Sequence, residues 1–364
     1  MSLAGGIDIA VVNYRGAHET LAAVAALGRW PHGTVWVVDN SADAAEAERL
    51  RLGLAAWPHA RLLVAADNLG FGRGCNLAFA QSAADYFFLL NPDARIAAAD
   101  ILAMAATLDA DPRIAAASPR IFWNEEHSFL LPCAQPQTLR ELLASTLASR
   151  LPALARRRAA RHLEQTRRQL QGGAPQEVAF LAGAALLLRR SALLRAGGLF
   201  DPGYFMFFED SELSVRLRRA GFRLALLPAA SAVHGYRHQQ FKAALMAQSR
   251  RRYFGQLHPG LGASLRWLDR IDAMARPLAP EPWFDRLGPP LQGAAAFGQA
   301  AQGAGVLALS PSLLMVPAML RNPAARHTGF SDAEWALLEP GGYVALLDGP
   351  GTARWVYFEK AGAA

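Results

Sequence analysis

The first ninety residues alternate between short apolar runs and segments with helical spacing. The apolar runs occupy 7–13, 35–38, 61–65 and 86–90. Runs that are apolar without alternation are typical of strands buried on both faces. Helical spacing is found at 18–28 and around 76–83. Strands that alternate with helices predict an α/β fold whose mostly parallel central sheet is flanked by helices.

Polar side chains stand where three of these strands are expected to end. They are Asn13-Tyr14, Asp39-Asn40 and Asn91-Pro92-Asp93. In open parallel sheets, ligands bind beyond the carboxyl ends of the strands. Asp and Asn also end strands and cap helices routinely, which explains any one of them without a ligand. Three such ends at one edge of a sheet favour a binding site there.

Glycines recur in the segment 67–76, DNLGFGRGCN. Glycine lets the backbone approach phosphates, and Arg73 could pair with a phosphate through two hydrogen bonds. A dinucleotide fingerprint would instead follow the first strand, and a P-loop would need GK[ST]. A tight turn between a strand and a helix explains the glycines equally well.

A second feature lies between 180 and 235. An apolar segment at 180–188, expected to be a core strand, and an aromatic run precede the adjacent acids Glu209 and Asp210, and His234 follows. Acids at a helix N-terminus interact favourably with the helix dipole, and Ser211 could cap that helix. The aromatic residues would raise the pKa of a catalytic acid, whereas the nearby arginines would lower it.

The formal net charge is +7, and 52% of the 364 residues are hydrophobic. The chain can therefore bury one large core and a smaller appended unit. The charge suits a phosphate-bearing ligand, an anionic membrane or nucleic acid, but no nucleic-acid-binding module is recognised, so we expect no nucleic acid. Only Cys75 and Cys133 occur, without CxxC spacing, which indicates neither a disulfide framework nor a zinc site.

Several blocks occur in an informative order. They are VVNYRG (11–16), VVDNS (37–41), DNLGFGRGCNLAF (67–79), FFLLNPDARI (87–96), FLAGAALLLRR (180–190), GGLFDPGYFMFFEDSELSVRLRRAGFRLALLP (197–228) and Val233-His234. Together they resemble the inverting GT-A glycosyltransferases of family 2, in the rhamnosyltransferase-like branch. The resemblance covers about 7–240 and implies a GT-A fold.

The resemblance also implies a site for a nucleotide-diphosphate sugar. Asp39 would hold the base or ribose, and the glycine segment would shape the floor near the diphosphate. The implied donor-binding residues are Asn13, Tyr14, Asp39, Asn40, Asn68, Gly70, Arg73, Asn76, Asn91 and Asp93.

A divalent metal, Mg²⁺ or Mn²⁺, is implied at Asp93 and His234. Such an ion neutralises the charge that develops on a diphosphate leaving group. Asn91 stands where many relatives carry the first acid of a DxD motif, so we expect the metal to be held weakly and to arrive with the donor.

Asp210 is the implied general base, because an inverting transfer needs a carboxylate that takes the proton of the attacking hydroxyl. Glu209 is its competitor, and Glu212 is a more distant one. The implied reaction moves a sugar, rhamnose or another deoxyhexose, to a hydroxyl of a surface polysaccharide or lipid-linked glycan of the bacterial envelope. The alternatives are a nucleotidyltransferase and a catalytically silent module that binds nucleotide sugars or glycans.

The segment 138–173 is helical in composition and carries eight arginines against two glutamates. It is compatible with peripheral contact to anionic lipid at the inner face of the membrane, and with a solvent-facing helical excursion over the acceptor cleft. The N-terminus has neither the basic region nor the apolar length of a signal peptide, so we expect a cytoplasmic protein.

The expected organisation is a glycosyltransferase domain at 1–238, a helical extension at 239–290 and an appended element at 291–364. In the last part, Ser331 and Glu334 form a capping-box pattern, and 343–347 with 354–358 predict a β-hairpin. Because an isolated hairpin is marginally stable, it should pack on the main domain or on another subunit of a homo-oligomer.

Overall fold

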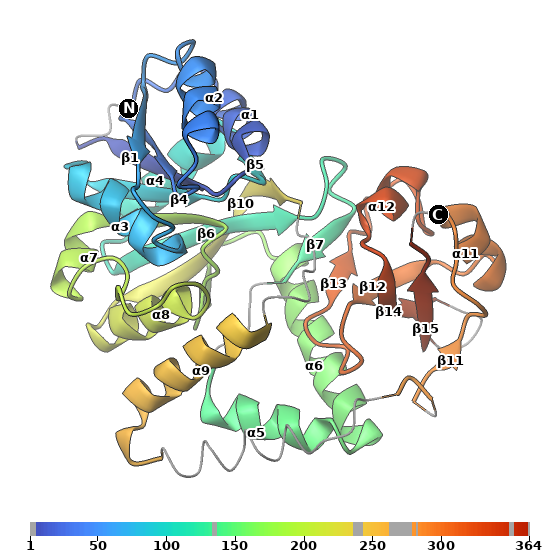
Figure 1. Ribbon diagram of the computed structural model, residues 1–364. Coiled ribbons are helices and arrows are strands. Elements are labelled where there is room, and N and C mark those ends of the chain that lie inside the picture. Colours follow the sequence, from blue (N-terminus) through green and yellow to red (C-terminus); the bar gives the residue numbers. More distant parts are fainter. Residues whose placement is uncertain are drawn as a thin grey trace.

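The computed structural model describes residues 5–132, 137–235, 243–261, 279–281, 283–348 and 353–362. One sheet runs through the molecule, in the strand order β11-β15-β14-β12-β13-β7-β6-β9-β4-β1-β2-β3, and β10 adds β5 and β8 to it. Figure 1 shows the N-terminal and C-terminal parts side by side, with helices below and between them.

The N-terminal part is the parallel portion of the sheet. Its strands are β1 (Ile7–Asn13), β2 (Val35–Asp39), β3 (Ala60–Val64) and β4 (Tyr86–Leu90). Its helices are α1 (Ala17–Leu27), α2 (Ala44–Leu54), α3 (Phe71–Gln81) and α4 (Ala98–Ala110). Helices α1, α2 and α4 pack on one face, while α3 packs on the other with α7 (Arg190–Arg195) and α8 (Glu209–Arg219). Each side of β1 and β4 is therefore buried, which accounts for their uninterrupted apolar sequences.

Beyond β4 the sheet becomes mixed. Strand β9 (Ala185–Arg189) lies antiparallel between β4 and β6 (Ile114–Phe122), and β10 (Arg223–His234) runs parallel to β6. The short strands β5 (Ala94–Ile96) and β8 (Gln176–Val178) are antiparallel to β10. The α/β class is confirmed, but the mostly parallel arrangement holds only for the N-terminal strands.

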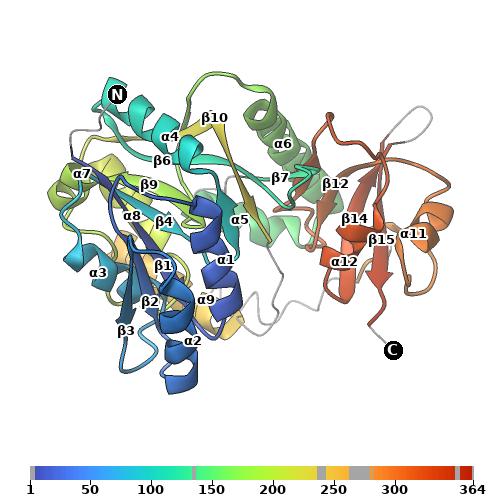
Figure 2. The same ribbon diagram turned by 90° about the horizontal axis from the view of Figure 1, so that it is seen from above.

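Helices α5 (Leu139–Ala148) and α6 (Pro152–Gln171) are formed by the arginine-rich segment. Both views show α6 running between the two parts of the molecule (Figures 1 and 2). Its buried residues Ala155 and Ala159 share a core with Met315 and Val344 of the C-terminal part. Helix α9 (Ala243–Leu257) and a 3-10 turn at Pro259–Leu261 follow β10. Residues 262–278 of the helical extension expected at 239–290 lie outside the described residues.

The C-terminal part contains the predicted hairpin. Its elements are β11 (Asp285–Arg286), α11 (Ala294–Ala300), β12 (Val306–Ser310), β13 (Met319–Arg321), α12 (Asp332–Leu337), β14 (Gly341–Leu347) and β15 (Arg354–Lys360). The capping box of Ser331 and Glu334 is confirmed, and so is the antiparallel pairing of β14 with β15.

The two parts share hydrogen bonds as well as packing. Strand β7 (Phe129–Leu131) pairs with β6 on one side and with β13 on the other, where Leu130 lies opposite Leu320. Trp123 and Phe129 are buried in the core of the C-terminal part. The hairpin therefore packs on its own chain. None of the described helices combines the length and the apolar character that crossing a bilayer requires.

Candidate active site

The carboxyl ends of β1 and β2 bring Asn13 opposite Asp39. Both side chains are fully buried, and Asn13 Nδ2 donates to Asp39 Oδ1 at 3.0 Å. The same Asp39 oxygen accepts from the backbone N–H of Ser41 at 3.0 Å. The position of both side chains is therefore fixed by strand pairing and by hydrogen bonds that the surrounding backbone supplies.

The second carboxylate oxygen of Asp39 is left without a partner. Oδ2 is buried and has no hydrogen bond to any residue that the structure describes. A buried carboxylate oxygen without a donor is costly, so this atom is poised to accept from a ligand. Tyr14 lies next in the chain, is 52% exposed and is flanked by the Arg15 guanidinium.

Two further residues hold Asn13 in place, and neither was predicted. Glu46 is buried on α2 and accepts from Asn13 Nδ2 at 3.2 Å and from the Ala17 N–H at 2.7 Å. The Ser41 hydroxyl accepts from Asn13 Nδ2 at 3.2 Å. Glu46 lies 33 residues from Asn13, and its place on α2 resembles that of an ordinary first-turn acid, so no pattern in the sequence marks it.

The glycine segment packs closely against protein. Helix α3 begins at Phe71, so Gly72 and Gly74 belong to the helix and not to the turn that was predicted. Gly70 has φ +80°, and a Cβ there would lie 2.1 Å from the Phe205 carbonyl oxygen. That oxygen accepts from the Phe71 N–H at 3.0 Å. The approach of 205 to 70–71 accounts for the glycine without a ligand.

The predicted donor residues in and around this segment fall into two groups. Asn40 Nδ2 donates to the Gly70 carbonyl at 2.8 Å, and Asn68 Oδ1 accepts from the Gly70 N–H at 3.0 Å, so both stay near the Asp39 edge. Arg73 Nε donates to the Pro202 carbonyl at 2.7 Å, and Asn76 holds the Phe200 backbone through both its amide atoms. In this structure Arg73 and Asn76 anchor the chain that leads to Glu209.

Asp93 and His234 meet through the pairing of β5 with β10. His234 Nε2 lies 3.1 Å from Asp93 Oδ1, and the Asp93 side chain is 45% exposed. Desolvation acts to raise the pKa of Asp93, but the hydrogen bond and charge of His234 outweigh it, and the pKa lies below its ordinary value. Among the described residues, no group of three or more His, Cys, Asp or Glu side chains is arranged to hold a metal ion.

The acids at the start of α8 follow an unusual backbone. Phe207 and Phe208 both have positive φ, 69° and 67°, which is uncommon for bulky residues. Phe208 occupies the N-cap position, so the predicted cap by Ser211 is wrong. Phe208 packs with Tyr204, Tyr253 and Phe254 in an aromatic cluster, which holds this turn in place. Two consecutive left-handed residues at one site are typical of strain retained for function.

Glu209 and Asp210 have different surroundings. Glu209 is 6% exposed and its side chain approaches Gly72 of α3, while Oε2 has no hydrogen bond to a described residue. Burial, together with the negative charge of Asp210, raises the pKa of Glu209 to about 8. Burial and the neighbouring carboxylate therefore favour the protonated form of Glu209, whose side chain is turned towards the protein interior.

Asp210 is only partly buried and faces the loop before β9. Its Oδ2 accepts from the Gly183 N–H at 3.3 Å, and Oδ1 accepts from the Ser211 N–H at 2.7 Å. Burial raises the pKa of Asp210 to about 6, and these N–H groups limit the rise. The pKa-raising effect of desolvation thus outweighs the pKa-lowering effects, a balance that the sequence alone did not decide.

The same loop joins Asp210 to the NPD motif. Ala184, next to Gly183, accepts through its carbonyl from the Asn91 N–H at 2.9 Å. Asn91 follows β4, and Asp93 lies two residues further on. Two adjacent loop residues therefore connect the end of the parallel sheet to the carboxylate of Asp210.

Comparison with known proteins decides the family. The sequence model described as "Glycosyltransferase like family 2" matches residues 5–255. The chain belongs to glycosyltransferase family 2. This family 2 member is 30% identical over 197 residues to the N-acetylglucosaminyl-diphospho-decaprenol L-rhamnosyltransferase of Mycobacterium tuberculosis, an alignment covering 50% of this chain and 61% of the relative. It is 46% identical over 61 residues to the rhamnosyltransferase WbbL of Escherichia coli, covering 17% and 23%.

The solved structures confirm the fold of this family 2 glycosyltransferase. A crystal structure of GalNAc-T7 with UDP, GalNAc and Mn²⁺ aligns with a TM-score of 0.54 at 15% identity, over 75% of this chain and 52% of that one. The predicted GT-A fold is thus confirmed. The predicted resemblance to rhamnosyltransferases rests on the two relatives above. The chain spans about 61% of the length of the mycobacterial relative it matches.

Proposed function

We propose that this family 2 glycosyltransferase moves rhamnose or another deoxyhexose from a nucleoside-diphosphate donor to a hydroxyl of a lipid-linked glycan or surface polysaccharide, with inversion. The observation that carries the proposal is the loop at 183–184, which holds Asp210 beside the end of β4 and its NPD motif. The names of two relatives, both rhamnosyltransferases, support the sugar.

The donor would lie over the ends of β1 and β2. The unpartnered Oδ2 of Asp39 is suited to accept from a base N–H or a ribose hydroxyl, because both are donors that a nucleotide presents. Asn13 and Asn40 are held beside it by hydrogen bonds. The exposed ring of Tyr14 offers a face on which a base can stack.

Asp93 and His234 are the residues that would hold Mg²⁺ or Mn²⁺. A carboxylate oxygen and an imidazole nitrogen at 3.1 Å form a fitting pair of ligands, and the donor's phosphate oxygens would supply the others. The ion, when bound, neutralises charge on the departing diphosphate. With two protein ligands, metal binding should depend on the donor.

Asp210 would act as the general base. The acceptor hydroxyl oxygen attacks the anomeric carbon from the face opposite the nucleotide, and the bond from that carbon to the diphosphate oxygen breaks. The hydroxyl proton passes to the Asp210 carboxylate, whose pKa of about 6 keeps it ionised at neutral pH and basic enough to accept. Glu209 is buried, and its raised pKa favours the protonated form, so it is less suited to this role.

The basic helices suggest where the acceptor is met. Leu143, Leu147 and Leu151 are exposed at spacings of four residues along and after α5. Arg140 and Arg150 are exposed in the same segment. Exposed apolar and basic side chains on one segment fit a peripheral contact with anionic lipid at the inner face of a membrane, where a lipid-linked acceptor resides.

A panel of nucleotide sugars, assayed for hydrolysis and transfer with Mg²⁺ and with Mn²⁺, tests the proposal. We expect Asp210→Asn to lose roughly 10²–10⁴-fold in turnover while it still binds the donor, and Glu209→Gln to retain turnover. Unaltered turnover in Asp210→Asn would refute the base. A wild-type protein that binds nucleotide sugars without turning any over would be a binding module instead.

A further inference from the structure

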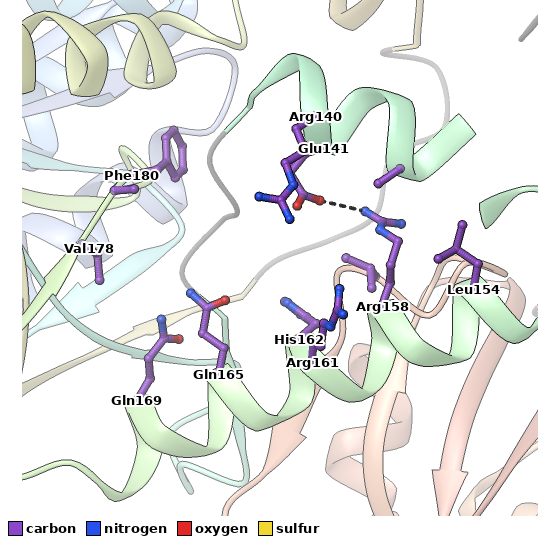
Figure 3. Close-up of a pocket in the computed structure, with 13 residues that line it drawn as sticks. Arg140, Glu141, Leu154, Arg158, Arg161, His162, Gln165, Gln169, Val178 and Phe180 are labelled. Atoms are coloured by element: carbon purple, nitrogen blue, oxygen red, sulfur yellow. Dashed lines mark hydrogen bonds and ion pairs between the residues drawn. The ribbon is translucent and has the colours of Figure 1, made fainter. Parts of the chain in front are cut away.

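A cavity of about 410 Å³ lies between α5, α6 and the segment that follows β8. Figure 3 shows Arg140 and Glu141 projecting from α5, and Arg158, Arg161 and His162 projecting from α6 across from them. Phe180 closes the side towards the main domain, and Val316 of the C-terminal part contributes to the wall. The cavity therefore joins the stretch 140–180 to a residue of the C-terminal part that is distant in sequence.

The lining is positively charged. Three guanidinium groups, of Arg140, Arg158 and Arg161, face one carboxylate, that of Glu141. Arg158 is 12% exposed and pairs with Glu141 Oε2 at 3.2 Å, which leaves the charges of Arg140 and Arg161 without compensation from the other lining side chains. Guanidinium groups form paired hydrogen bonds with phosphate oxygens. A walled cavity with excess positive charge is suited to an anion of that kind.

The cavity is built as a site and not left as a gap between helices. His162 is 2% exposed, and its Nε2 accepts from the Ala318 N–H at 3.1 Å, so the C-terminal part fixes the ring. Buried Gln169 adds a polar amide to the lining. The C-terminal part thus holds α6 in the position that shapes the cavity.

A short loop joins the cavity to the proposed base. Phe180 lines the cavity, the Leu181 N–H donates to Ser214 Oγ of α8 at 3.4 Å, and the Gly183 N–H donates to Asp210. Three residues span at most roughly 11 Å. One hexose with a phosphate on its anomeric oxygen has a comparable reach. The proposed donor residues Asn13, Asp39 and Asp93 are absent from the lining.

We propose that this cavity holds the phosphate or diphosphate group of the acceptor while the acceptor hydroxyl lies at Asp210. The inference rests on the proposed transfer to a lipid-linked glycan and adds where its anionic group is recognised. Arg140 and Arg161 bind the phosphate oxygens, and the ion pair of Arg158 with Glu141 keeps the two helices in register.

The test compares two acceptors that carry the same sugar, a short-chain alkyl diphosphate and a neutral alkyl glycoside. In Arg140→Gln/Arg161→Gln we expect KM for the diphosphate acceptor to rise about tenfold or more, with kcat, donor hydrolysis and the neutral acceptor unchanged. The matched control is Arg157→Gln/Arg167→Gln, which removes two exposed arginines of α6 outside the cavity. It should behave like wild type with both acceptors.

The other outcomes overturn the proposal. An unchanged KM in the cavity variant, or an equal loss with the neutral acceptor, would show that the arginines do not recognise the phosphate. An equal loss in both variants, accompanied by weaker binding to phosphatidylglycerol vesicles, would assign the effect to a membrane surface.

Calorimetric titration with inorganic pyrophosphate in EDTA separates this proposal from the proposed function. Wild type and control should bind pyrophosphate, and the cavity variant should not. If the wild-type protein binds pyrophosphate in this way but turns over no donor, the anion site is supported and the transferase function is refuted. If the wild-type protein turns over a donor but binds no pyrophosphate, the transferase function is supported and the anion site is refuted.

Discussion

Asp210 and Glu209 are adjacent, yet the start of α8 places them in opposite surroundings. Glu209 points at α3 and is buried, whereas Asp210 accepts from Gly183 and keeps part of its surface accessible. Burial raises the pKa of both carboxyl groups, to about 8 for Glu209 and to about 6 for Asp210. Protonation is therefore favoured more at Glu209 than at Asp210, which makes Asp210 the better proton acceptor near pH 7.

This difference predicts the pH dependence of the reaction. Because the base must be ionised, kcat/KM should fall about tenfold per pH unit below pH 6 and be level above it. With an ordinary aspartate as the base, this acidic limb of the pH profile would lie near pH 4. The measurement is a pH profile of kcat/KM with a saturating metal concentration.

Glu209→Gln is the control for that profile, because the amide resembles the protonated acid. Its profile should keep the limb near pH 6. If the acidic limb disappears in Glu209→Gln, Glu209 and not Asp210 is the base.

The positions of single residues were predicted well where a strand ends, while their roles stay predictions. The sequence identified Asn13, Asp39 and Asp93 because apolar runs stop there. It could not reveal Glu46, which holds Asn13 from another helix, because that hydrogen bond depends on how α2 packs. The pairing of Arg73 with a phosphate stays a prediction. The sequence could not reveal that Arg73 Nε donates to the Pro202 carbonyl, because Pro202 lies 129 residues away in the chain.

At the scale of elements, two boundaries were misjudged for physical reasons. The apolar segment at 180–188 was expected to be a strand throughout, but 180–184 is a loop and β9 begins at Ala185. Phe180 and Leu181 are buried in that loop, so hydrophobicity alone cannot distinguish it from a strand. Helix α3 starts earlier than predicted because its glycines permit close packing within a helix.

Gly70→Ala tests whether the turn before α3 needs a glycine for the fold. The new Cβ would meet the Phe205 carbonyl at 2.1 Å, and φ +80° is unfavourable for alanine. We expect a loss of roughly 2–3 kcal/mol in the free energy of unfolding, measured by denaturant titration. Turnover should fall as well, because Phe205 leads into Glu209 and Asp210.

The matched control is Gly28→Ala. Gly28 also has positive φ, at 61°, but a Cβ there has no neighbour within 4 Å. Gly28→Ala therefore introduces the backbone strain without the steric clash, and it should lower the free energy of unfolding by less than Gly70→Ala does. Equal losses in the two variants would show that the contact with Phe205 is unimportant.

At the scale of the whole molecule, the hairpin and its packing on the main domain or on another subunit were predicted, but the strands that attach it were not. Turn residues and alternating patterns reveal β14 and β15, whereas the bridge consists of two strands of three residues each, β7 and β13. Strands of that length carry no periodic signal, and nearly 190 residues separate Leu130 from Leu320. The continuous sheet implies that the two parts unfold together.

Glu334→Gln tests this coupling. Arg321 and Glu334 form an ion pair at 3.1 Å with side chains 7% and 4% exposed, and the Arg321 guanidinium lies 4.1 Å from the Phe129 ring of β7. Removing the negative charge leaves Arg321 buried and uncompensated, which should cost about 3–5 kcal/mol, although glutamine can still complete the capping box.

Because β13 carries Arg321 and pairs with β7, the whole chain should unfold in one cooperative transition, and the loss of the ion pair should lower the midpoint temperature of that transition. Thermal inactivation of sugar transfer should shift in parallel with it. Arg354→Gln, which breaks the exposed ion pair with Asp285, should change stability by less than about 1 kcal/mol. A separate early transition in Glu334→Gln that leaves sugar transfer intact would mean that the C-terminal part folds independently. It would also refute the idea that the C-terminal part holds α6 in place.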